Sequence, residues 1–462
     1  MFTIIRPNFK DKIYNILDYG AKSDICFNNQ KPIQNAIDEC SKNGGGMVLI
    51  PPGYYLTGPI ELKSNVNLHV SESAYVQFTK SKEEYPLIFT IYEGIRRIRA
   101  ISPIRAYEAN NIAITGRGVM DGAGHLWRGI KKWKLTEREW QRCLKKSPFV
   151  KPSNEGGIWC PTETYYNGVM GKEPDYNNPN ALEIASECWD MYRPVFVSLI
   201  KCDKVLIEDI TLKNSPAWNV HPLYCTNFTM NKAVIKNKFS AQNGDGIDIE
   251  SCQNCEIANS VFEVGDDGIC IKSGKNKDDI YAPTKNVWIH DCKVFDAHGG
   301  FVVGSEIGRG ASNILVENCI FDGTDIGVRF KAARDRGGFA ENIKIKNIQM
   351  NNIIGEAIIF TMNYILVNIE DTKEKKIPID KSKLPEFKDI ILENINCNNA
   401  NVGIKINGLK ESPIHDITIR NSKILAENSM ELSYCENINL ENTIVITPAE
   451  ELNFTNEIIN SL

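Results

Sequence analysis

The chain has 462 residues, of which 42% are hydrophobic and 24% are charged, with 53 Lys and Arg against 58 Asp and Glu. This composition is typical of a folded globular protein, because disordered chains combine few hydrophobic residues with a high net charge. The formal net charge of −5 argues against binding to nucleic acids or anionic membranes, which needs a concentrated basic surface. The sequence contains no run of about 18 apolar residues, so we expect no membrane-spanning helix.

The N-terminal residues MFTIIRPNFKDKI carry several charges and lack the apolar core of a secretory signal peptide. We therefore expect a cytoplasmic protein, or a secreted or periplasmic one if a leader was removed. The 14 cysteines are scattered along the chain, which favours buried free thiols over a disulfide scaffold. Cys252 and Cys255 form a C-x-x-C motif without a second pair at zinc spacing, so we expect no metal and no cofactor.

A short amphipathic helix is predicted over residues 32–42. Ile33, Ala36, Ile37 and Cys40 recur at helical spacing, with a proline at the start and three glycines after the end. Such a helix can cover an open end of a β-structure, so we assign residues of about 14–60 to an N-terminal cap.

Residues of about 122–192 interrupt the strand pattern with tryptophans, prolines and the segment KKWK. An excursion of this length is normally a loop insertion on one face, and such loops often carry binding sites. The alternative is a surface insertion without a function.

A short pattern recurs through the second half of the chain, mostly at intervals of roughly 21 to 32 residues. Each copy is a strand of alternating apolar and polar residues followed by Asn or Asp. The Asn and Asp residues that align are Asp209, Asn259, Asp291, Asn318, Asn347, Asn394, Asn421 and Asn442. Stacked coils of parallel strands have such a period, and Asn or Asp at a bend can form a ladder between coils. We predict an all-β, right-handed parallel β-helix that forms a single domain over residues 1–462.

Four segments depart from the repeat and place charged residues beside glycines: NGDGIDIES, GDDGICIKSG, AHGGFVVGSE and GVRFKAARDRGG. Asp245, Asp267, His298 and Arg329 follow one another at steps of about one coil, so we expect them on one face of the solenoid. A lone pair of aspartates or an isolated histidine is usually structural, but their coincidence at coil spacing favours a functional site. The glycines leave room for a bulky ligand.

Three carboxylates beside a row of cations indicate hydrolysis of a glycosidic bond between acidic sugars. This reaction needs one carboxylic acid to protonate the leaving oxygen and a second, ionised carboxylate to activate water or attack the sugar. Crowding of Asp245, Asp266 and Asp267 should keep one of them protonated. Arg329 and Lys331 lie two residues apart in a strand and can grip a substrate carboxylate.

These segments resemble the motifs of glycoside hydrolase family 28, the polygalacturonase family, and in particular its bacterial exo-type members. The family motifs read N-T-D, G-D-D, G-H-G and R-I-K, and here they appear in the same order as NGD, GDD, AHG and RFK. The opening stretches YNILDYGAKSD and GGGMVLIPPGYYLTGPI also look like the start of these proteins. The resemblance spans residues of about 14–440 and implies a right-handed parallel β-helix.

The resemblance implies a role for each residue that matches a motif. Asp266 is the general acid, Asp245 and Asp267 hold and deprotonate the water, and His298 tunes the acid. The anomeric configuration is inverted, and no metal takes part.

The resemblance also implies that Arg329 and Lys331 bind the galacturonate carboxylate and that Tyr364 contacts the substrate. The departures from the family motifs are Gly244, Ala297 and Phe330. None of them removes an ionisable group, so the chemistry is unaffected, but the shape of a subsite and the linkage preference are open. We interpret Asp248 and Glu250 as structural.

We therefore expect a hydrolase that cleaves α-1,4-linked galacturonic acid from pectic oligosaccharides, acting from one end of the chain. The insertion at 122–192 would wall off one end of the cleft, and a cytoplasmic enzyme would meet only imported oligomers. The residues expected in this wall are Trp127, Trp133, Trp140, Trp159, Lys131, Lys132 and Arg193. The alternatives are a rhamnogalacturonan galacturonohydrolase, a calcium-dependent pectate lyase and a polysaccharide-binding protein without activity.

Overall fold

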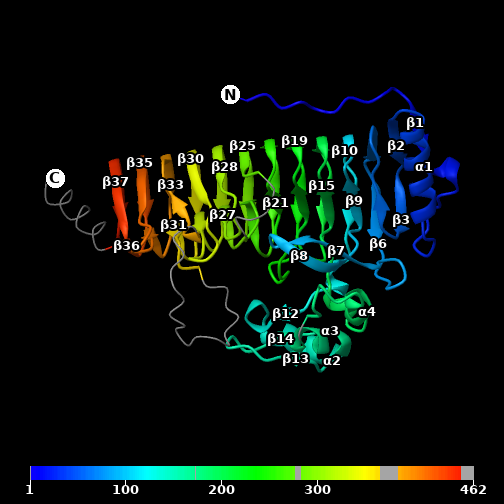
Figure 1. Ribbon diagram of the computed structural model, residues 1–462, viewed down its shortest axis with the longest axis horizontal. Helices are drawn as coiled ribbons and strands as arrows, with labels where there is room; N and C mark the ends of the chain where they lie inside the picture. Colours follow the sequence, from blue (N-terminus) through cyan, green and yellow to red (C-terminus); the bar gives the residue numbers. More distant parts are fainter. Residues whose placement is uncertain (1, 172, 276–281, 365–382, 449–462) are drawn as a thin grey trace, which may run out of the picture. The chain divides into compact units, whose positions relative to one another are not determined.

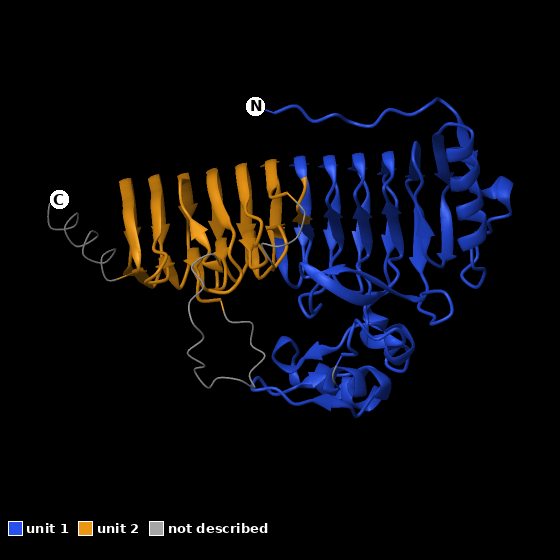
Figure 2. Ribbon diagram, viewed as in Figure 1, with its two compact units in different colours: residues 1–248, 253–268 blue, residues 249–252, 269–462 orange. Residues whose placement is uncertain are grey.

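The computed structural model describes residues 2–171, 173–275, 282–364 and 383–448. Two compact units can be distinguished (Figure 2). The first unit comprises residues up to 248 together with 253–268, and the second comprises 249–252 and the residues from 269 onward. Two of the boundaries fall within strands β21 (Ile247–Glu250) and β24 (Asp267–Lys272), and the third lies between residues 252 and 253. That the chain is one domain stays a prediction.

The first unit consists of coils whose strands pair in parallel with the next coil (Figure 1). The first ladder contains β1 (Ile13–Asn15), β2 (Gly46–Ile50), β5 (Val66–Val70), β10 (Asn110–Thr115), β16 (Asp203–Glu208), β19 (Thr226–Asn231) and β22 (Gln253–Ala258). The second ladder contains β3 (Gly53–Thr57), β6 (Ala74–Phe78), β11 (Val119–Asp121), β17 (Thr211–Lys213), β20 (Val234–Lys236) and β23 (Val261–Glu263). The third ladder contains β4 (Ile60–Glu61), β9 (Ile104–Tyr107), β15 (Val197–Ile200) and β18 (Val220–Leu223).

The second unit has the same coiled organisation. Its longer ladder contains β25 (Thr284–His290), β26 (Lys293–Phe295), β28 (Ala311–Asp322), β30 (Phe339–Asn351), β32 (Glu386–Phe387), β33 (Ile390–Cys397), β35 (Ile414–Leu425) and β37 (Cys435–Ile446). The other ladder contains β27 (Gly299–Gly304), β29 (Val328–Lys331), β31 (Glu356–Thr361), β34 (Val402–Asn407) and β36 (Asn428–Ser433). The prediction of an all-β, right-handed parallel β-helix is confirmed.

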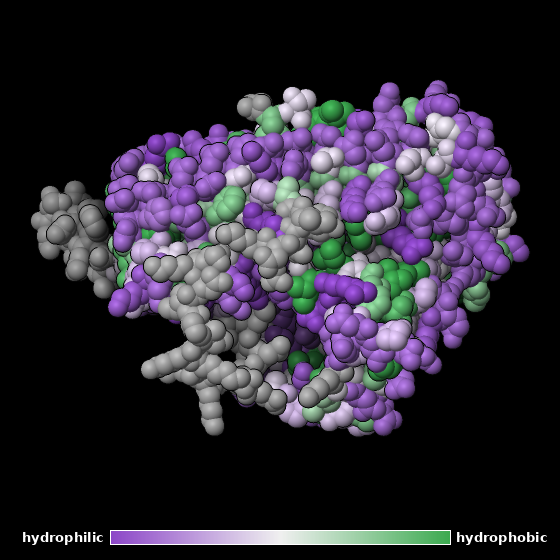
Figure 3. All heavy atoms as spheres, viewed as in Figure 1, coloured by the Kyte–Doolittle hydropathy of each residue, from purple (hydrophilic) through white to green (hydrophobic). Residues whose placement is uncertain are grey.

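The interior of each unit is apolar because every second side chain of a strand points inward. In β5, Val66, Leu68 and Val70 are fully buried, and the residues between them are half-buried. Identical positions of successive coils stack, so a continuous core runs through each unit. Hydrophilic residues cover most of the molecular face in Figure 3.

The predicted column of Asn and Asp residues marks a bend in the left-handed region. All eight residues have φ between 45° and 61°, a conformation that Asn and Asp tolerate better than most side chains. Their amides also connect neighbouring coils. The Nδ2 of Asn347 donates to Oδ1 of Asn318 at 3.0 Å, and that of Asn394 donates to Oδ1 of Asn347 at 2.9 Å. The ladder is therefore confirmed.

The N-terminal helix is present as α1 (Gln30–Lys42) and begins two residues before the predicted start. Ile33, Ala36, Ile37 and Cys40 are buried, so the face predicted from their spacing is the face that covers the first coils. All 14 cysteines are free and most are buried. Within the residues that the structure describes, no helix has both the length and the apolar character needed to cross a bilayer.

The insertion at 122–192 is folded and not an open loop. It contains α2 (Glu137–Lys146), α3 (Glu163–Met170), α4 (Ala181–Ser186) and a small antiparallel sheet of β12 (Ile130–Lys131), β13 (Val150–Lys151) and β14 (Ile158–Trp159). Trp127, Trp140 and Trp159 are buried, whereas Trp133 is exposed. The expectation that these four tryptophans line a wall is wrong for the three buried ones, because they stabilise the insertion or its contact with the solenoid.

An antiparallel hairpin lies between the insertion and the third ladder. It consists of β7 (Leu87–Tyr92) and β8 (Ile95–Ala100). Ile98 on one side packs against Ala181 and Ala185 of the insertion. Tyr92 at the tip packs against Val195, Ala217 and Trp218. The hairpin is thus supported by the insertion and covers part of a sheet face.

Candidate active site

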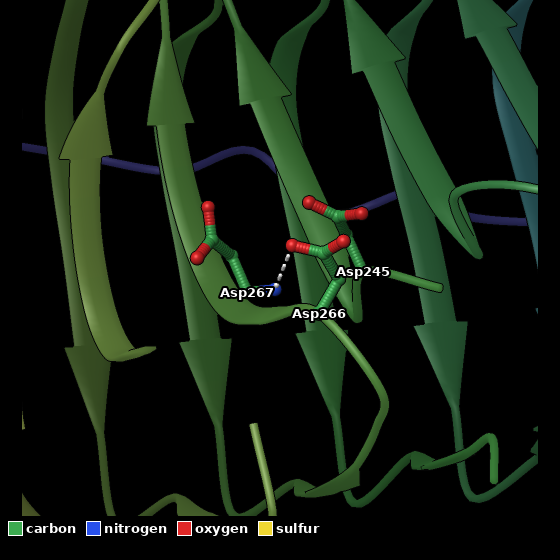
Figure 4. A group of neighbouring side chains, drawn as sticks. All are labelled: Asp245, Asp266 and Asp267. Carbon is green, nitrogen blue, oxygen red and sulfur yellow. Dashed lines mark hydrogen bonds between the residues drawn. The ribbon is translucent and has the colours of Figure 1, made fainter. Parts of the chain in front are cut away.

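Three predicted aspartates come together in the first unit. Asp245 lies just before β21, Asp266 lies just before β24, and Asp267 is the first residue of β24. One carboxylate oxygen from each lies within 4.8 Å of the others, and Figure 4 shows the three side chains at adjacent turns. Asp245 and Asp267 are only 3% and 2% exposed, whereas Asp266 is partly exposed. The structure therefore contains the predicted crowded carboxylates.

Backbone hydrogen bonds hold this cluster in place. Asp267 N donates to Oδ1 of Asp266 at 3.1 Å, and Asn243 N donates to its Oδ2 at 3.2 Å. On the preceding coil, the backbone N and the Nδ2 of Asn219 both donate to the carbonyl oxygen of Asp245 at 3.0 Å. Both oxygens of Asp266 are thus oriented by the main chain.

Two cations tie the insertion and its C-terminal end to the aspartate loops. Lys134 Nζ donates to the carbonyl oxygens of Phe239, at 3.0 Å, and of Gly265, which precedes Asp266. Arg193 donates to the carbonyl oxygens of Pro216 and Gln242 at 3.0 and 2.8 Å, and to Oδ1 of Asn243 at 2.8 Å. Arg193 is 6% exposed, so it supports the site internally and is not the surface cation of the wall that the sequence suggested.

Gly244 has no room for a side chain. A Cβ at this position would come within 2.8 Å of both Cβ of Ala241 and Nδ2 of Asn237. Asn237 also donates from Nδ2 to the carbonyl oxygen of Gly244 at 3.0 Å. The loop is therefore packed around a glycine at the position where the family motif has threonine.

The second unit contains the other predicted residues. His298 lies just before β27, and its Nε2 is 3.8 Å from Oδ2 of Asp325. Arg329 and Lys331 are on β29, where they pair with Val302 and Gly304 of β27. Tyr364 lies beside both cations, with its ring centre 5.5 Å from Cζ of Arg329 and 5.2 Å from Nζ of Lys331. The structure therefore groups Arg329, Lys331 and Tyr364.

Phe330 does not belong to a subsite. It is fully buried, and its ring stacks on that of Phe360 with a centroid distance of 4.5 Å and an interplanar angle of 12°. Alternation along β29 directs Phe330 inward and its two cationic neighbours outward. The expectation that Phe330 could change the linkage preference is wrong, because its side chain belongs to the solenoid core. Ala297 is also fully buried.

Lys272, which follows the aspartate motif, forms a buried ion cluster in the second unit. Its Nζ is 3.0 Å from Glu306 Oε2, and Arg336 Nη1 is 3.2 Å from Glu306 Oε1. Burial acts to raise the pKa of Glu306, but the charges of Lys272 and Arg336 outweigh it and lower the pKa to about 2. This cluster is a structural element of the coil.

The oxygens of the three aspartates are also close enough to share a metal ion, and no other group of side chains among the described residues is. Ca²⁺ usually takes six to eight oxygen ligands. Three carboxylates would supply only part of such a shell, and the hydrolytic reaction needs no metal.

Reasoning from the sequence missed the supporting roles of Asn219, Asn243, Lys134 and Arg193. Asn243 was visible as the first residue of the NGD motif. Arg193 contacts residues that are 23, 49 and 50 positions away, so no local pattern reveals its partners. The hairpin β7–β8 was also missed, because alternation does not distinguish antiparallel strands from the parallel strands of a solenoid.

Comparison with known proteins gives consistent results. A family model described as "Glycosyl hydrolases family 28" matches residues 183–445, and a model described as "Rhamnogalacturonase A/epimerase, pectate lyase-like" matches residues 13–77. The exo-poly-alpha-D-galacturonosidase of Dickeya chrysanthemi is 29% identical over 416 residues, which cover 86% of this chain and 64% of that protein. The chain thus spans slightly less than two thirds of the length of the Dickeya protein.

Endo-acting proteins are also similar, at lower identity. The endo-polygalacturonase of Pectobacterium carotovorum subsp. carotovorum is 25% identical, over 87% of this chain and 85% of that protein. Among solved structures, a hyperthermoactive exopolygalacturonase from Thermotoga maritima superimposes with a TM-score of 0.75 and 28% identity, over 96% of this chain and 93% of that chain.

Proposed function

Because the chain belongs to the glycosyl hydrolases of family 28, we propose that it cleaves α-1,4-linked galacturonic acid from the non-reducing end of pectic oligosaccharides. The observation that carries the proposal is the cluster of Asp245, Asp266 and Asp267. Glycoside hydrolysis needs a protonated and an ionised carboxyl group at the same bond, and the cluster offers three groups within 4.8 Å.

In the proposed mechanism, Asp266 protonates the leaving oxygen. It is the most exposed member of the cluster, so a leaving group can reach it. Two like charges about 5 Å apart repel each other by about 3 kcal/mol at an effective dielectric constant of 20. The charges of Asp245 and Asp267 therefore favour a proton on the cluster. The two backbone N–H groups that donate to Asp266 act in the opposite direction, because each stabilises the ionised carboxylate by about 1.5–3 kcal/mol.

Asp245 and Asp267 hold and deprotonate the attacking water, and the anomeric configuration is inverted. In most glycosidases the two carboxyl groups lie about 6.5–9.5 Å apart for inversion and about 5–5.5 Å apart for retention. The short distances here make a nucleophilic aspartate the second candidate mechanism. A third carboxylate favours the water mechanism, since two groups can orient one water while the third remains the acid.

We assign substrate binding to Arg329, Lys331 and Tyr364. Arg329 and Lys331 point from the same face of β29 and can accept a uronate carboxylate through charge-assisted hydrogen bonds. Tyr364, whose ring lies beside both cations, supplies an aromatic surface for the sugar. His298 adjusts the protonation of the acid. That these residues and the three aspartates act on one substrate is part of the proposal.

The covered sheet face in the first unit supports exo action. The hairpin β7–β8 packs over the third ladder, and its tip contacts Trp218, one residue before Asn219, which holds Asp245. A substrate chain that enters the site from the side opposite the hairpin would therefore end beneath the hairpin. The similarity to exo-acting proteins from Dickeya and Thermotoga supports the same assignment.

Digestion of a long oligogalacturonate, followed by sizing of the early products, tests the proposal. We expect small products of uniform size while the remaining substrate shortens slowly. Asp266→Asn should lower kcat at least about 10²-fold, because general acid catalysis contributes that much. Asp291→Asn is the matched control, since Asp291 occupies the bend that is Asn in most coils. Early products of all intermediate lengths would reject exo action.

The alternatives predict different results. A rhamnogalacturonan galacturonohydrolase would prefer oligomers that contain rhamnose, and the match to a rhamnogalacturonase-like model covers only residues 13–77, outside the site. A calcium-dependent lyase would give a product that absorbs ultraviolet light and would lose activity with a chelator. A binding protein would show no turnover and would retain binding in Asp266→Asn.

For the cellular location, we propose the cytoplasm. The free state of all 14 cysteines, most of them buried, supports a reducing compartment. Fractionation of cells that express the native gene tests this, and recovery of the protein from the medium or the periplasm would contradict it.

A further inference from the structure

Part of the insertion in the first unit is strongly basic, although the whole chain has a net charge of −5. Residues 128–151 contain nine Lys and Arg but two acidic residues, Glu137 and Glu139. Both carboxylates are already in use. Oε2 of Glu137 is 3.8 Å from Nζ of Lys132, and Oε2 of Glu139 accepts hydrogen bonds from the backbone N and the Oγ1 of Thr136. Positive charge therefore dominates this segment.

Two buried arginines of the first unit add to this charge. Arg128 is 4% exposed and donates to the carbonyl oxygen of Ser215 at 2.9 Å and to Oδ1 of Asn214 at 2.8 Å. Burial and the charge of Arg193 lower the pKa of Arg128 to about 9, so it is still a cation at neutral pH. Arg193 likewise donates to carbonyl and amide oxygens. Neutral acceptors stabilise a guanidinium without cancelling its charge, so its field reaches the surface.

An exposed pair of aromatic rings lies where the loop after β20 meets the insertion. Trp133 is 44% exposed and Phe239 is 38% exposed. Their rings pack edge to face, with centroids 6.0 Å apart and an interplanar angle of 78°. Nζ of Lys131 lies 5.8 Å from the ring centre of Trp133. An aromatic surface beside a cation can contact the apolar face of a sugar and its carboxylate together.

Exposed cations of α2 and of the same loop lie close to each other. Partial burial of its ring lowers the pKa of His125, and the positive charges of Lys238 and Lys146 add to this decrease against the charge of Asp121. Lys238 directly precedes Phe239, so these charges adjoin the aromatic pair. Arg142 is one helical turn from Lys146, on the same side of α2. We define the basic patch as Arg142, Lys146 and Lys238, which are all exposed and form no ion pair within the described part of the chain.

The aromatic pair is attached to the loops that carry the aspartates. The loop after β20 contains Phe239 and leads to Asp245, just before β21. Nζ of Lys134 donates to the carbonyl oxygens of Phe239 and Gly265, and Gly265 precedes Asp266. A polymer bound to this surface would have its sugars near the active site. Such binding raises the local concentration of chain ends without a new contact at the cleaved bond.

We propose that the basic patch and the aromatic pair form a second binding surface for polygalacturonate, separate from the residues that bind the sugar at the cleaved bond. The inference rests on the proposed hydrolysis of galacturonate and adds to it an anchor for long chains. Each sugar of this polymer carries one negative charge and an apolar face, which match the cations and the exposed rings. Several weak contacts along one chain add up, whereas a trimer is too short to use both sites.

Kinetics on substrates of different length test this inference. The double variant Lys146→Met/Lys238→Met and the variant Trp133→Ala should each lower kcat/KM for polygalacturonate at least about 5-fold. Their kcat/KM for trigalacturonate should equal that of the wild type. Lys31→Met, which removes an exposed lysine of α1, is the matched control and should leave both values unchanged. Equal losses on the two substrates, or wild-type kinetics of the double variant on the polymer, would overturn the inference.

Salt should remove the difference between the double variant and the wild type. The Debye length falls from about 10 Å at 0.1 M salt to about 3 Å at 1 M, so the two proteins should have similar kcat/KM for polygalacturonate at 1 M NaCl. A difference that persists at high salt would contradict an electrostatic anchor. Thermal unfolding checks that all variants fold.

Binding without turnover separates this inference from the proposed function. In electrophoresis through gels that contain polygalacturonate, Asp266→Asn should be retarded, and Lys146→Met/Lys238→Met in the same background should be retarded less. Equal retardation of the two by the polymer, or equally strong retention by DNA, would overturn the assignment to polygalacturonate. Patch-dependent retardation combined with a wild type that hydrolyses no oligomer would overturn the proposed function and leave the binding surface intact.

Discussion

Arg193 holds Asn243, whose backbone amide in turn donates a hydrogen bond of 3.2 Å to Oδ2 of Asp266. Arg193 also donates to the carbonyl oxygens of Pro216 and of Gln242, the residue that precedes Asn243. The guanidinium is buried and uses three acceptors, so it fixes the loop that orients Asp266, the proposed general acid. In the proposed mechanism Arg193 does not contact the reacting atoms, so we assign it a positioning role.

Replacement of Arg193 should therefore reduce turnover more than substrate binding. We expect Arg193→Met to lower kcat about 10- to 100-fold with little change in KM, because a misplaced acid affects the transition state. The melting temperature should also fall, since buried acceptors lose their donors at about 1–3 kcal/mol each. Steady-state kinetics and thermal unfolding measure both effects.

Two further variants make this prediction specific. Arg138→Met removes an exposed arginine of α2 and should leave the kinetics unchanged. Arg193→Lys should recover part of kcat, because it restores one charged donor. A loss of kcat/KM that lies entirely in KM would show that Arg193 does not position the acid.

Lys331 and Arg329 should determine selectivity for a charged substrate. A charge-assisted hydrogen bond is worth about 1.5–3 kcal/mol, so Lys331→Met should raise KM for oligogalacturonides about 10- to 100-fold. On a methyl-esterified oligomer, which lacks the carboxylate, the variant and the wild type should have similar kcat/KM. Lys293→Met, an exposed lysine of β26, is the control. Equal losses on both substrates would argue against a carboxylate contact.

Phe330 should affect stability and not specificity. Phe330→Ile leaves a cavity beside Phe360 and should lower the free energy of unfolding by roughly 1–3 kcal/mol. The ratio of rates on homogalacturonan and rhamnogalacturonan oligomers should stay the same. Denaturant unfolding and the two rates measure this, and a changed ratio would show that the side chain influences a subsite from within the core.

The cluster of Lys272, Glu306 and Arg336 should make stability depend on pH. The pKa of Glu306 is lowered to about 2 from a usual value of 4.5. A lowered carboxylate pKa stabilises the folded state fully above the unfolded value, and this contribution is lost as the pH falls from about 4.5 toward 2. Glu306→Gln should cost about 3–5 kcal/mol at pH 7, since it leaves two buried cations without their partner.

Urea unfolding at pH 7 and pH 3 measures this effect. The difference in the free energy of unfolding between Glu306→Gln and the wild type should shrink at pH 3. At this pH the unfolded wild-type chain gains stability by protonation of Glu306, so the folded wild type loses part of its advantage. Glu436→Gln, which alters an exposed carboxylate of β37, should change stability little at either pH. An equal difference between Glu306→Gln and the wild type at both pH values would contradict the role of its charge.

The repetitive parts of the fold could be predicted from the sequence because they depend on local rules. The bends at Asn318, Asn347 and Asn394 need residues that tolerate positive φ, and the strand alternation reports which side chains point inward. The same alternation that directs Arg329 outward also directs Phe330 inward, so its burial was predictable. Parallel pairing then explains why aspartates from separate turns meet.

The supporting structure could not be predicted because it depends on contacts between distant segments. The tryptophans at 127, 140 and 159 are consistent with either an exposed wall or a buried core, and only tertiary packing decides between them. The hairpin β7–β8 and the partners of Arg193 depend on how the insertion folds back onto the solenoid coils of the first unit. The basic patch, which combines residues of α2 with the loop after β20, therefore becomes visible only in three dimensions.

The most direct test of the proposed chemistry is proton NMR of tetragalacturonate during its first turnovers. Inverting hydrolysis of the α-linkage by Asp245, Asp266 and Asp267 predicts that the β-anomer of the released sugar forms first and then mutarotates. Initial formation of the α-anomer, or of an unsaturated product, would contradict the account.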